Sequence, residues 1–209
     1  MAQLILASQS PRRRELLATA GFHFTVRSRP VEEVRAQGES PVEYVRRLAR
    51  GKAEAARESA ADGESSLKNG DEIVLGADTV VVLGDRVLEK PVDADDARAM
   101  LRALSGREHL VITGICILSP LIKPEGAIVD HEITQVHFVE LTENEIEAYV
   151  LSGEPADKAG AYAIQGLASK FVDRIEGCYF NVMGLPLALV YRHWKAMLPD
   201  GRGSVRGEH

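Results

Sequence analysis

Short apolar runs alternate along the chain with longer segments in which apolar residues recur every three or four positions. The first pattern predicts buried strands, and the second predicts amphipathic helices packed on a sheet. Strands are expected near residues 4–7, 73–75, 80–83, 86–88, 109–118, 128–140 and 170–172, and helices near 10–21, 40–60, 93–104, 142–153 and 185–198. Interleaved strands and helices predict a mixed α/β sheet with flanking helices.

Local signals support several of these boundaries. Ser10 before Pro11 is a typical helix start, with a hydroxyl at the N-cap and proline at the first helical position. Ser40 and Glu43 have the spacing of a capping box at the start of the next helix. The Gly-Asp pair at 84–85 predicts a two-residue turn between two strands.

Length limits the domain organisation. A chain of 209 residues can build one sizeable core, in one or two lobes, but not two ordinary domains. Residues 62–71 are polar and rich in Gly, Ser and Asn, which predicts a linker, and residues 199–209 resemble a disordered tail. We therefore expect a single domain over residues 1–198 with a tail at 199–209.

Composition and charge exclude several classes of protein. Apolar residues make up 45% and charged residues 27%, which is typical of a soluble globular protein. Aromatic residues are only 5% and the net charge is -6, so nucleic acid is not an expected partner. No run approaches 18 apolar residues, and the apolar start is too short for a secretory signal. The two cysteines are isolated, as is usual in a reducing compartment. These features together predict a cytoplasmic protein that does not cross a membrane.

Basic residues gather in the first quarter of the chain. Residues 1–57 hold 11 Lys and Arg against 6 Asp and Glu. Ser8, Arg12 and Arg13 lie at a strand end and a helix start, where backbone N–H groups and guanidinium groups would converge. Cations at a helix N-terminus cost about 0.3–1 kcal/mol each, so their presence favours a bound anion such as a phosphate. The alternative is a pair of exposed arginines on a surface helix.

Two further charged residues stand among apolar neighbours. Lys52 lies on the apolar stripe of its helix, so its ammonium either extends to the edge of the core or meets a buried anion. Asp78 lies in a Gly-Ala-Asp-Thr segment between two apolar strands, where a carboxylate is costly unless it is paired or binds a metal. A plain turn is the alternative there. The carboxylate of Asp78 could hold Mg²⁺ and could also take a proton from water.

Three other segments add candidate residues. Lys90 follows the predicted hairpin and could return toward Asp78, although a charged strand end is equally ordinary. Glu33 lies in a polar loop, where a solvated side chain is the default expectation. Residues 153–166 are rich in glycine and small residues, which either let a backbone approach a ligand closely or form a plain connection between a helix and a strand. Within them, Tyr162 offers a flat ring and Gln165 offers an amide that can read a base edge.

Taken in order, these segments resemble the Maf family of house-cleaning nucleoside triphosphate pyrophosphatases. The resemblance covers residues 2–198, and residues 157–166 are similar to the dTTP/UTP subfamily rather than the 7-methyl-GTP one. The linker at 62–71 is longer than is usual in the family, and the tail has no match. The segments that carry the resemblance are Ser8 to Arg13, Glu33, Tyr44 to Lys52, Gly76 to Val80, Glu89 to Pro91, Thr113 with Gly114, and Gly153 to Gly166.

The resemblance implies a fold like that of inosine triphosphatase, with a cleft between two lobes of an elongated sheet. It implies that Asp78 accepts the proton of the attacking water, and that Glu33 and Asp78 bind Mg²⁺ or Mn²⁺. It further implies that the triphosphate is bound by Ser8, Arg13, Lys52 and Lys90, and that base specificity is set by Arg12, Thr79 and Gln165. The implied products are a nucleoside monophosphate and pyrophosphate.

Two alternatives stay open from the sequence. The same enzyme could prefer modified pyrimidine or non-canonical purine triphosphates. The chain could instead be a nucleotide-binding regulator of cell division in which catalysis is secondary. Whether two chains form a homodimer is also open.

Overall fold

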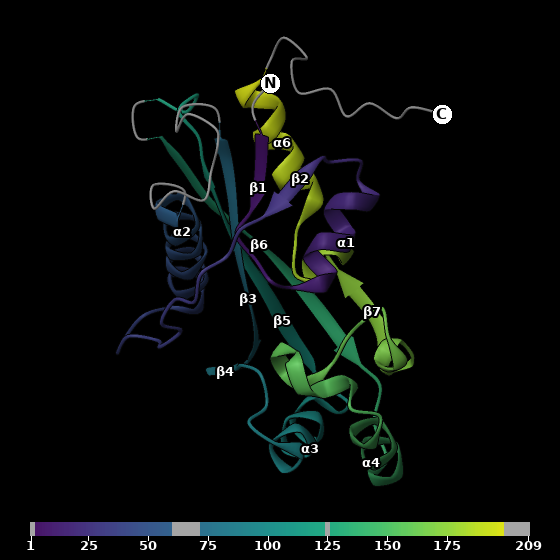
Figure 1. Cartoon of the computed structure of the whole chain (residues 1–209). Helices are drawn as coiled ribbons and strands as arrows, with labels where there is room; N and C mark the ends of the chain where they lie inside the picture. Colours follow the sequence, from purple (N-terminus) through teal and green to yellow (C-terminus); the bar gives the residue numbers. More distant parts are fainter. Residues whose placement is uncertain (1–2, 60–71, 124–125, 199–209) are drawn as a thin grey trace. The chain divides into compact units, whose positions relative to one another are not determined.

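A mixed sheet organises the structure, a computed structural model that describes residues 3–59, 72–123 and 126–198 (Figure 1). The strand order is β2-β1-β3-β5-β6-β7, and β4 pairs with β3. β1 pairs in parallel with β2 and β3, whereas the β3–β4 and β6–β7 pairs are antiparallel. The strands are β1 (Gln3–Leu6), β2 (Phe24–Val26), β3 (Glu72–Leu83), β4 (Arg86–Leu88), β5 (Glu108–Leu118), β6 (Ala127–Phe138) and β7 (Val172–Glu176).

Helices flank the strands, which confirms the predicted mixed α/β class. The α-helices are α1 (Pro11–Thr19), α2 (Pro41–Ser59), α3 (Ala94–Leu104), α4 (Glu143–Leu151), α5 (Tyr179–Val182) and α6 (Leu187–Met197). Short 3-10 helices are η2 (Glu154–Asp157), η3 (Ala159–Ala161) and η4 (Leu167–Phe171). Among the residues that the structure describes, no helix combines the length and the apolarity that a bilayer crossing requires.

The chain forms two compact units, which are described one at a time. The first unit contains the residues up to Asp78, Thr113–Glu132 and the residues from Gly184, and the second contains Thr79–Ile112 and Ile133–Met183. The single domain and the cleft stay predictions. The predicted linker at 62–71 and the tail at 199–209 lie outside the described residues.

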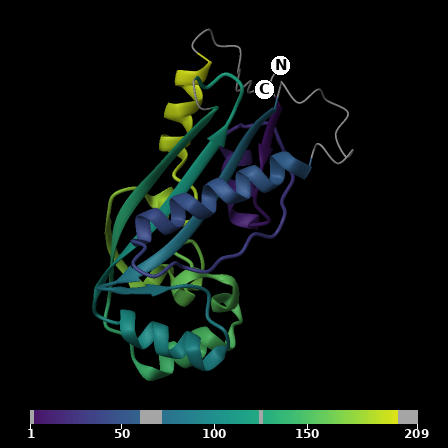
Figure 2. The same ribbon diagram turned by 90° about the vertical axis from the view of Figure 1, so that its left-hand side faces the viewer.

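In the first unit, α2 covers one face of the strands, and α1 and α6 lie on the other face (Figures 1 and 2). Two strand glycines bring α2 unusually close to the sheet. A Cβ atom at Gly114 would overlap the backbone carbonyl of Val45, and one at Gly76 would overlap that of Ala49. Since neither glycine has a positive φ, each is required for space rather than for conformational freedom.

In the second unit, α3 packs against α4, and an aromatic cluster fills the adjoining core. The ring of Phe138 lies 4.8 Å from Tyr162 and 5.0 Å from His109, both edge to face. The Nε2 atom of His109 lies 2.9 Å from the Tyr162 hydroxyl. Burial, with a smaller contribution from His137, lowers the pKa of His109 to about 4. The imidazole of His109 is therefore neutral in the folded protein near pH 7.

Three predicted elements differ from the structure. The two strands expected at 73–75 and 80–83 are one continuous strand, because the Gly-Ala-Asp-Thr segment stays extended under α2 instead of turning. The strand expected at 170–172 begins only at Val172, since the preceding residues form η4. The short elements β2 and α5 carry too few residues for a periodic signal, and the sequence analysis missed them.

Replacing Gly114 by alanine tests the close packing of α2. We expect Gly114→Ala to lower the free energy of unfolding by about 1–3 kcal/mol or more, because the new methyl group meets helix backbone that cannot rotate away. Gly51 lies within α2 with open space around it, so Gly51→Ala should raise stability by about 0.5–1 kcal/mol. Urea unfolding of both variants measures the difference, and equal effects would contradict the packing argument.

The buried neutral imidazole of His109 predicts a loss of stability in mild acid. The unfolded chain binds this proton near pH 6.5 and the folded chain only near pH 4, so stability falls as the pH drops through that window. At pH 5 the expected loss is about 2 kcal/mol relative to pH 7.5. Urea unfolding at both pH values should show a smaller difference for His109→Gln, and an unchanged difference would rule out this origin.

Candidate active site

One ammonium group joins two carboxylates in the first unit. The Nζ atom of Lys52 lies 2.6 Å from Oδ1 of Asp78 and 2.7 Å from Oε1 of Glu33. The side chain of Lys52 is 15% exposed and that of Asp78 is 10% exposed. Of the two interpretations of Lys52, the structure supports contact with a buried anion. Asp78 lies in the strand β3 and not in a turn.

The packing of α2 on β3 produces this contact. Side chains alternate between the faces of a strand, so Gly76 and Asp78 point to the same face of β3. The missing Cβ of Gly76 lets the backbone of Ala49 and Ala53 reach the strand. Lys52 lies between Ala49 and Ala53 on the side of α2 that faces the strand. Its aliphatic stem extends to Asp78, which is two residues after Gly76 on β3.

A buried guanidinium lies beside this ion pair. The Nε atom of Arg13 donates to the carbonyl of Gly184 at 2.8 Å, and Nη1 donates to Oγ of Ser8 at 3.1 Å and to the carbonyl of Ala77 at 3.0 Å. Burial lowers the pKa of Arg13, and the nearby carboxylate of Asp78 opposes that shift. Arg13 thus connects the first turn of α1 to β3 and to the residues before α6.

The position of Asp78 makes its carboxylate a stronger base than an ordinary aspartate. Burial raises the pKa of Asp78, and the positive charges of Lys52 and Arg13 oppose the rise. Glu33 adds to it as a second negative charge. A carboxylate with a raised pKa holds a proton more strongly once it has taken one from water. Its ion pair with Lys52 also fixes its orientation.

The loop that carries Glu33 is fastened to α2. The hydroxyl of Tyr44 donates to the backbone carbonyl of Glu33 at 3.0 Å, and Nη2 of Arg47 donates to the carbonyl of Val34 at 2.9 Å. Tyr44 is almost fully buried. Tyr44 was not among the residues predicted for the site, although a hydroxyl-bearing ring on an otherwise aliphatic helix stripe is a usable signal.

Glu33 and Asp78 fit a divalent cation held together with a substrate. Their oxygens converge on one point, which the ammonium nitrogen of Lys52 occupies. Mg²⁺ is usually held by one or two carboxylates, with waters and substrate phosphates completing its shell. Within the described parts of the chain there is no group of three or more His, Cys, Asp or Glu suited to a metal. The remaining coordination would therefore come from phosphate oxygens and water.

Three predicted residues belong to the second unit. Thr79 follows Asp78 on β3 and is half-buried, with its side chain on the opposite face of the strand. Lys90 is exposed just after β4, and Gln165 is exposed just before η4. The N–H of Gly160 donates to the carbonyl of Glu89 at 3.0 Å, so the loop leading to Gln165 is joined to the residue before Lys90.

The predicted residues therefore form two groups. The first unit brings together Ser8, Arg13, Glu33, Lys52 and Asp78, with the half-buried Arg12 next to Arg13 on α1. The second unit carries Thr79, Lys90 and Gln165.

One further interpretation from the sequence is wrong. Tyr162 was expected to offer its ring to a base, but it is only 6% exposed. Its ring packs into the aromatic cluster, and its hydroxyl is bonded to His109. The neighbouring Gln165 carries the exposed polar group of this loop.

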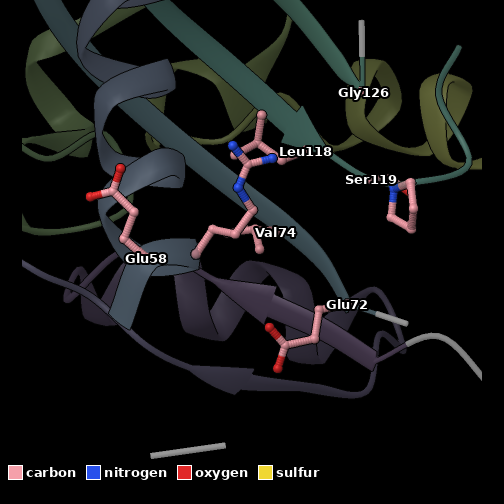
Figure 3. A pocket seen from close by; sticks show the side chains of 8 residues that line it. Glu58, Glu72, Val74, Leu118, Ser119 and Gly126 are labelled. Carbon is pink, nitrogen blue, oxygen red and sulfur yellow. The ribbon is translucent and has the colours of Figure 1, made fainter. Parts of the chain in front are cut away.

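A separate cavity of about 360 Å³ lies in the first unit, near the start of β3 (Figure 3). The predicted site residues are not among its described lining residues. These are Arg57, Glu58, Glu72, Val74, Leu118, Ser119, Pro120 and Gly126.

Comparisons with known proteins agree with the motifs. A family described as Maf-like protein matches residues 3–197. A dTTP/UTP pyrophosphatase of Hahella chejuensis is 50% identical over 185 residues, which is 88% of this chain and 87% of that protein. A dTTP/UTP pyrophosphatase of Geobacillus sp. is 47% identical over 197 residues, 94% of this chain and 99% of its own. These matches confirm the resemblance inferred from the sequence.

One solved structure resembles the chain weakly. The Ham1 protein of Staphylococcus aureus covers 93% of this chain and 98% of its own length, with a TM-score of 0.49 and 14% identity. We base no conclusion about this chain on a structural similarity this weak.

Removing the charge of Lys52 should raise the pKa of Asp78 further. Burial favours the protonated carboxyl, and Lys52 opposes burial through its charge and its hydrogen bond. We expect Lys52→Met to move the titration of Asp78 to higher pH, measured by ¹³C NMR of the carboxyl carbon in metal-free protein. Arg50→Met removes a cation that pairs with Glu54 on the same helix and should leave the titration in place. A lower pKa in Lys52→Met would contradict the assigned electrostatics.

Proposed function

This chain belongs to the Maf family, and from that premise we propose that it hydrolyses dTTP and UTP to the nucleoside monophosphate and pyrophosphate. The observation that carries the mechanism is the buried carboxylate of Asp78, oriented by Lys52 and lying beside Arg13. The alternative of a nucleotide-binding regulator is not favoured, since the relatives are named for the hydrolytic activity. A cytoplasmic location is part of the proposal.

In the proposed reaction, Asp78 accepts a proton from the water that attacks a phosphorus. A new bond forms between the water oxygen and that phosphorus, the P–O bond that links the α- and β-phosphates breaks, and the monophosphate and pyrophosphate separate without a covalent enzyme intermediate. In the metal-free protein burial raises the pKa of Asp78, and the contact with Lys52 holds the carboxylate in one orientation for accepting the proton.

The cations of the site would bind the triphosphate. Lys52 is placed to exchange its contact with Glu33 for phosphate oxygens while it keeps its contact with Asp78, and Arg13 holds the Ser8 hydroxyl in a fixed position. Arg12 and Lys90 would add positive charge, which stabilises the charge that develops on the phosphate oxygens. Glu33 and Asp78 would hold Mg²⁺ or Mn²⁺, which when bound supplies further positive charge at the phosphates. We assign base specificity to Arg12, Thr79 and Gln165.

A product assay tests the reaction and the substrate class together. The protein is incubated with Mg²⁺ or Mn²⁺ and with dTTP, UTP, modified pyrimidine triphosphates, ITP and 7-methyl-GTP, and the products are separated by chromatography. We expect monophosphate and pyrophosphate, formed fastest from dTTP and UTP. Faster turnover of a modified pyrimidine would change the substrate, and no turnover despite binding would favour the regulator.

Replacing Asp78 by asparagine tests the assigned base. Asp78→Asn keeps the shape of the side chain but cannot accept the proton, so kcat should fall about a hundredfold or more. Nucleotide binding measured without a divalent cation should persist, because the lysine and arginine side chains proposed to bind the phosphates are unchanged. Asp85→Asn, in the exposed β3–β4 turn, makes the same chemical change away from the site and should keep wild-type kcat. Near-wild-type turnover of Asp78→Asn would remove this residue from the mechanism.

A further inference from the structure

The carboxylate of Glu154 in the second unit is directed at the loop that carries Gln165. Its Oε1 atom accepts a hydrogen bond from the hydroxyl of Tyr149 at 2.9 Å, and its Oε2 atom accepts one from the N–H of Leu167 at 3.1 Å. The Tyr149 oxygen in turn accepts the N–H of Ala163 at 3.2 Å. One carboxylate therefore fastens both ends of the segment 163–167.

Gly166 provides the space for this carboxylate. A Cβ atom at this position would overlap both oxygens of Glu154 and lie 2.5 Å from its Cδ. The φ of Gly166 is -104°, which any residue can adopt, so the glycine is needed for room and not for conformation. The N–H of Gly166 also donates to the carbonyl of Ala163 at 3.0 Å, closing a turn with Gln165 inside it.

The carboxylate is not required by its own short helix. The N–H of Glu154 is bonded to Oγ of Ser152, and its backbone carbonyl accepts from Nζ of Lys158 at 2.6 Å. These contacts involve only the backbone of Glu154, so its carboxylate is available to accept hydrogen bonds from outside η2. A buried tyrosine hydroxyl and a backbone N–H are the partners it meets there.

We propose that Glu154 and Tyr149 are positioning residues that hold Gln165 for recognition of the nucleotide base. The inference rests on the proposed function, since it assumes that Gln165 reads the base. An exposed glutamine on an unfastened loop would lose conformational freedom on each binding event, and this cost would weaken nucleotide binding. Fastening both ends of the turn removes that cost before the nucleotide arrives.

Steady-state kinetics of Glu154→Ala test the link to Gln165. We expect the kcat/KM for dTTP and UTP to fall about tenfold, mainly through KM, while values for poorly recognised nucleotides such as ITP change little. Gln165→Ala should have the same signature. The double variant should lose no more than Gln165→Ala alone, because both substitutions remove one interaction. Additive losses, or an equal loss on every nucleotide, would overturn the proposal.

Two variants separate positioning from general destabilisation. Glu147→Ala removes a carboxylate on α4 that pairs with Arg98 on α3, away from the turn, so it should leave the nucleotide preference intact. Gly166→Ala keeps the carboxylate but fills its space, and it should reproduce the selective loss in KM. A selective loss in Glu147→Ala, or none in Gly166→Ala, would count against the proposal.

Amide hydrogen exchange tests the fastening without any substrate. In the wild type the amides of Ala163 and Leu167 should exchange slowly, and in Glu154→Ala the Leu167 amide should exchange about tenfold faster or more. Unchanged exchange at Leu167 overturns the fastening itself. If the wild type hydrolyses neither dTTP nor UTP, the proposed function fails and the recognition role of Glu154 fails with it, while exchange still decides whether the turn is held.

Discussion

The burial of one carboxylate, that of Asp78, is the constraint on which the first unit depends. A charged group inside an apolar strand is destabilising unless opposite charge and hydrogen bonds reach it. Lys52 reaches it from α2, and Arg13 lies close enough to oppose the rise in its pKa. The close approach of α2 in turn needs a strand without a Cβ at Gly76. The charge balance around Asp78 therefore depends on the same close packing of α2 on β3 that Gly76 allows.

Glycine has the same function at several points of this protein. Gly76 and Gly114 make room for helix backbone, and Gly166 makes room for the carboxylate of Glu154. None of the three has a positive φ, so their value lies in the missing side chain and not in unusual backbone geometry. At Gly76 and Gly166 the space lies beside residues proposed to act on the nucleotide, Asp78 and Gln165.

The residues proposed to act on the nucleotide differ in chemical type between the two units. The first contains the buried acid, the ammonium and guanidinium groups and the carboxylates that fit a divalent cation. The second contains exposed polar side chains on loops that are fastened by hydrogen bonds, with Gln165 as the clearest case. Buried charges suit the stabilisation of charge on the phosphates, because a low local dielectric strengthens interactions between charges. Exposed amides suit recognition of a base edge.

The sequence by itself determined the mixed α/β class, the helix starts and the segments that carry the chemistry, because caps, periodicity and motif order are local properties of the chain. It left open whether Lys52 extends to solvent or meets an anion, and it misjudged Asp78 as lying between two strands and Tyr162 as an available ring. Only the tertiary structure decided these points. A contact between residues 26 positions apart, such as Lys52 with Asp78, depends on how closely a helix lies on a strand, and no local pattern records that distance.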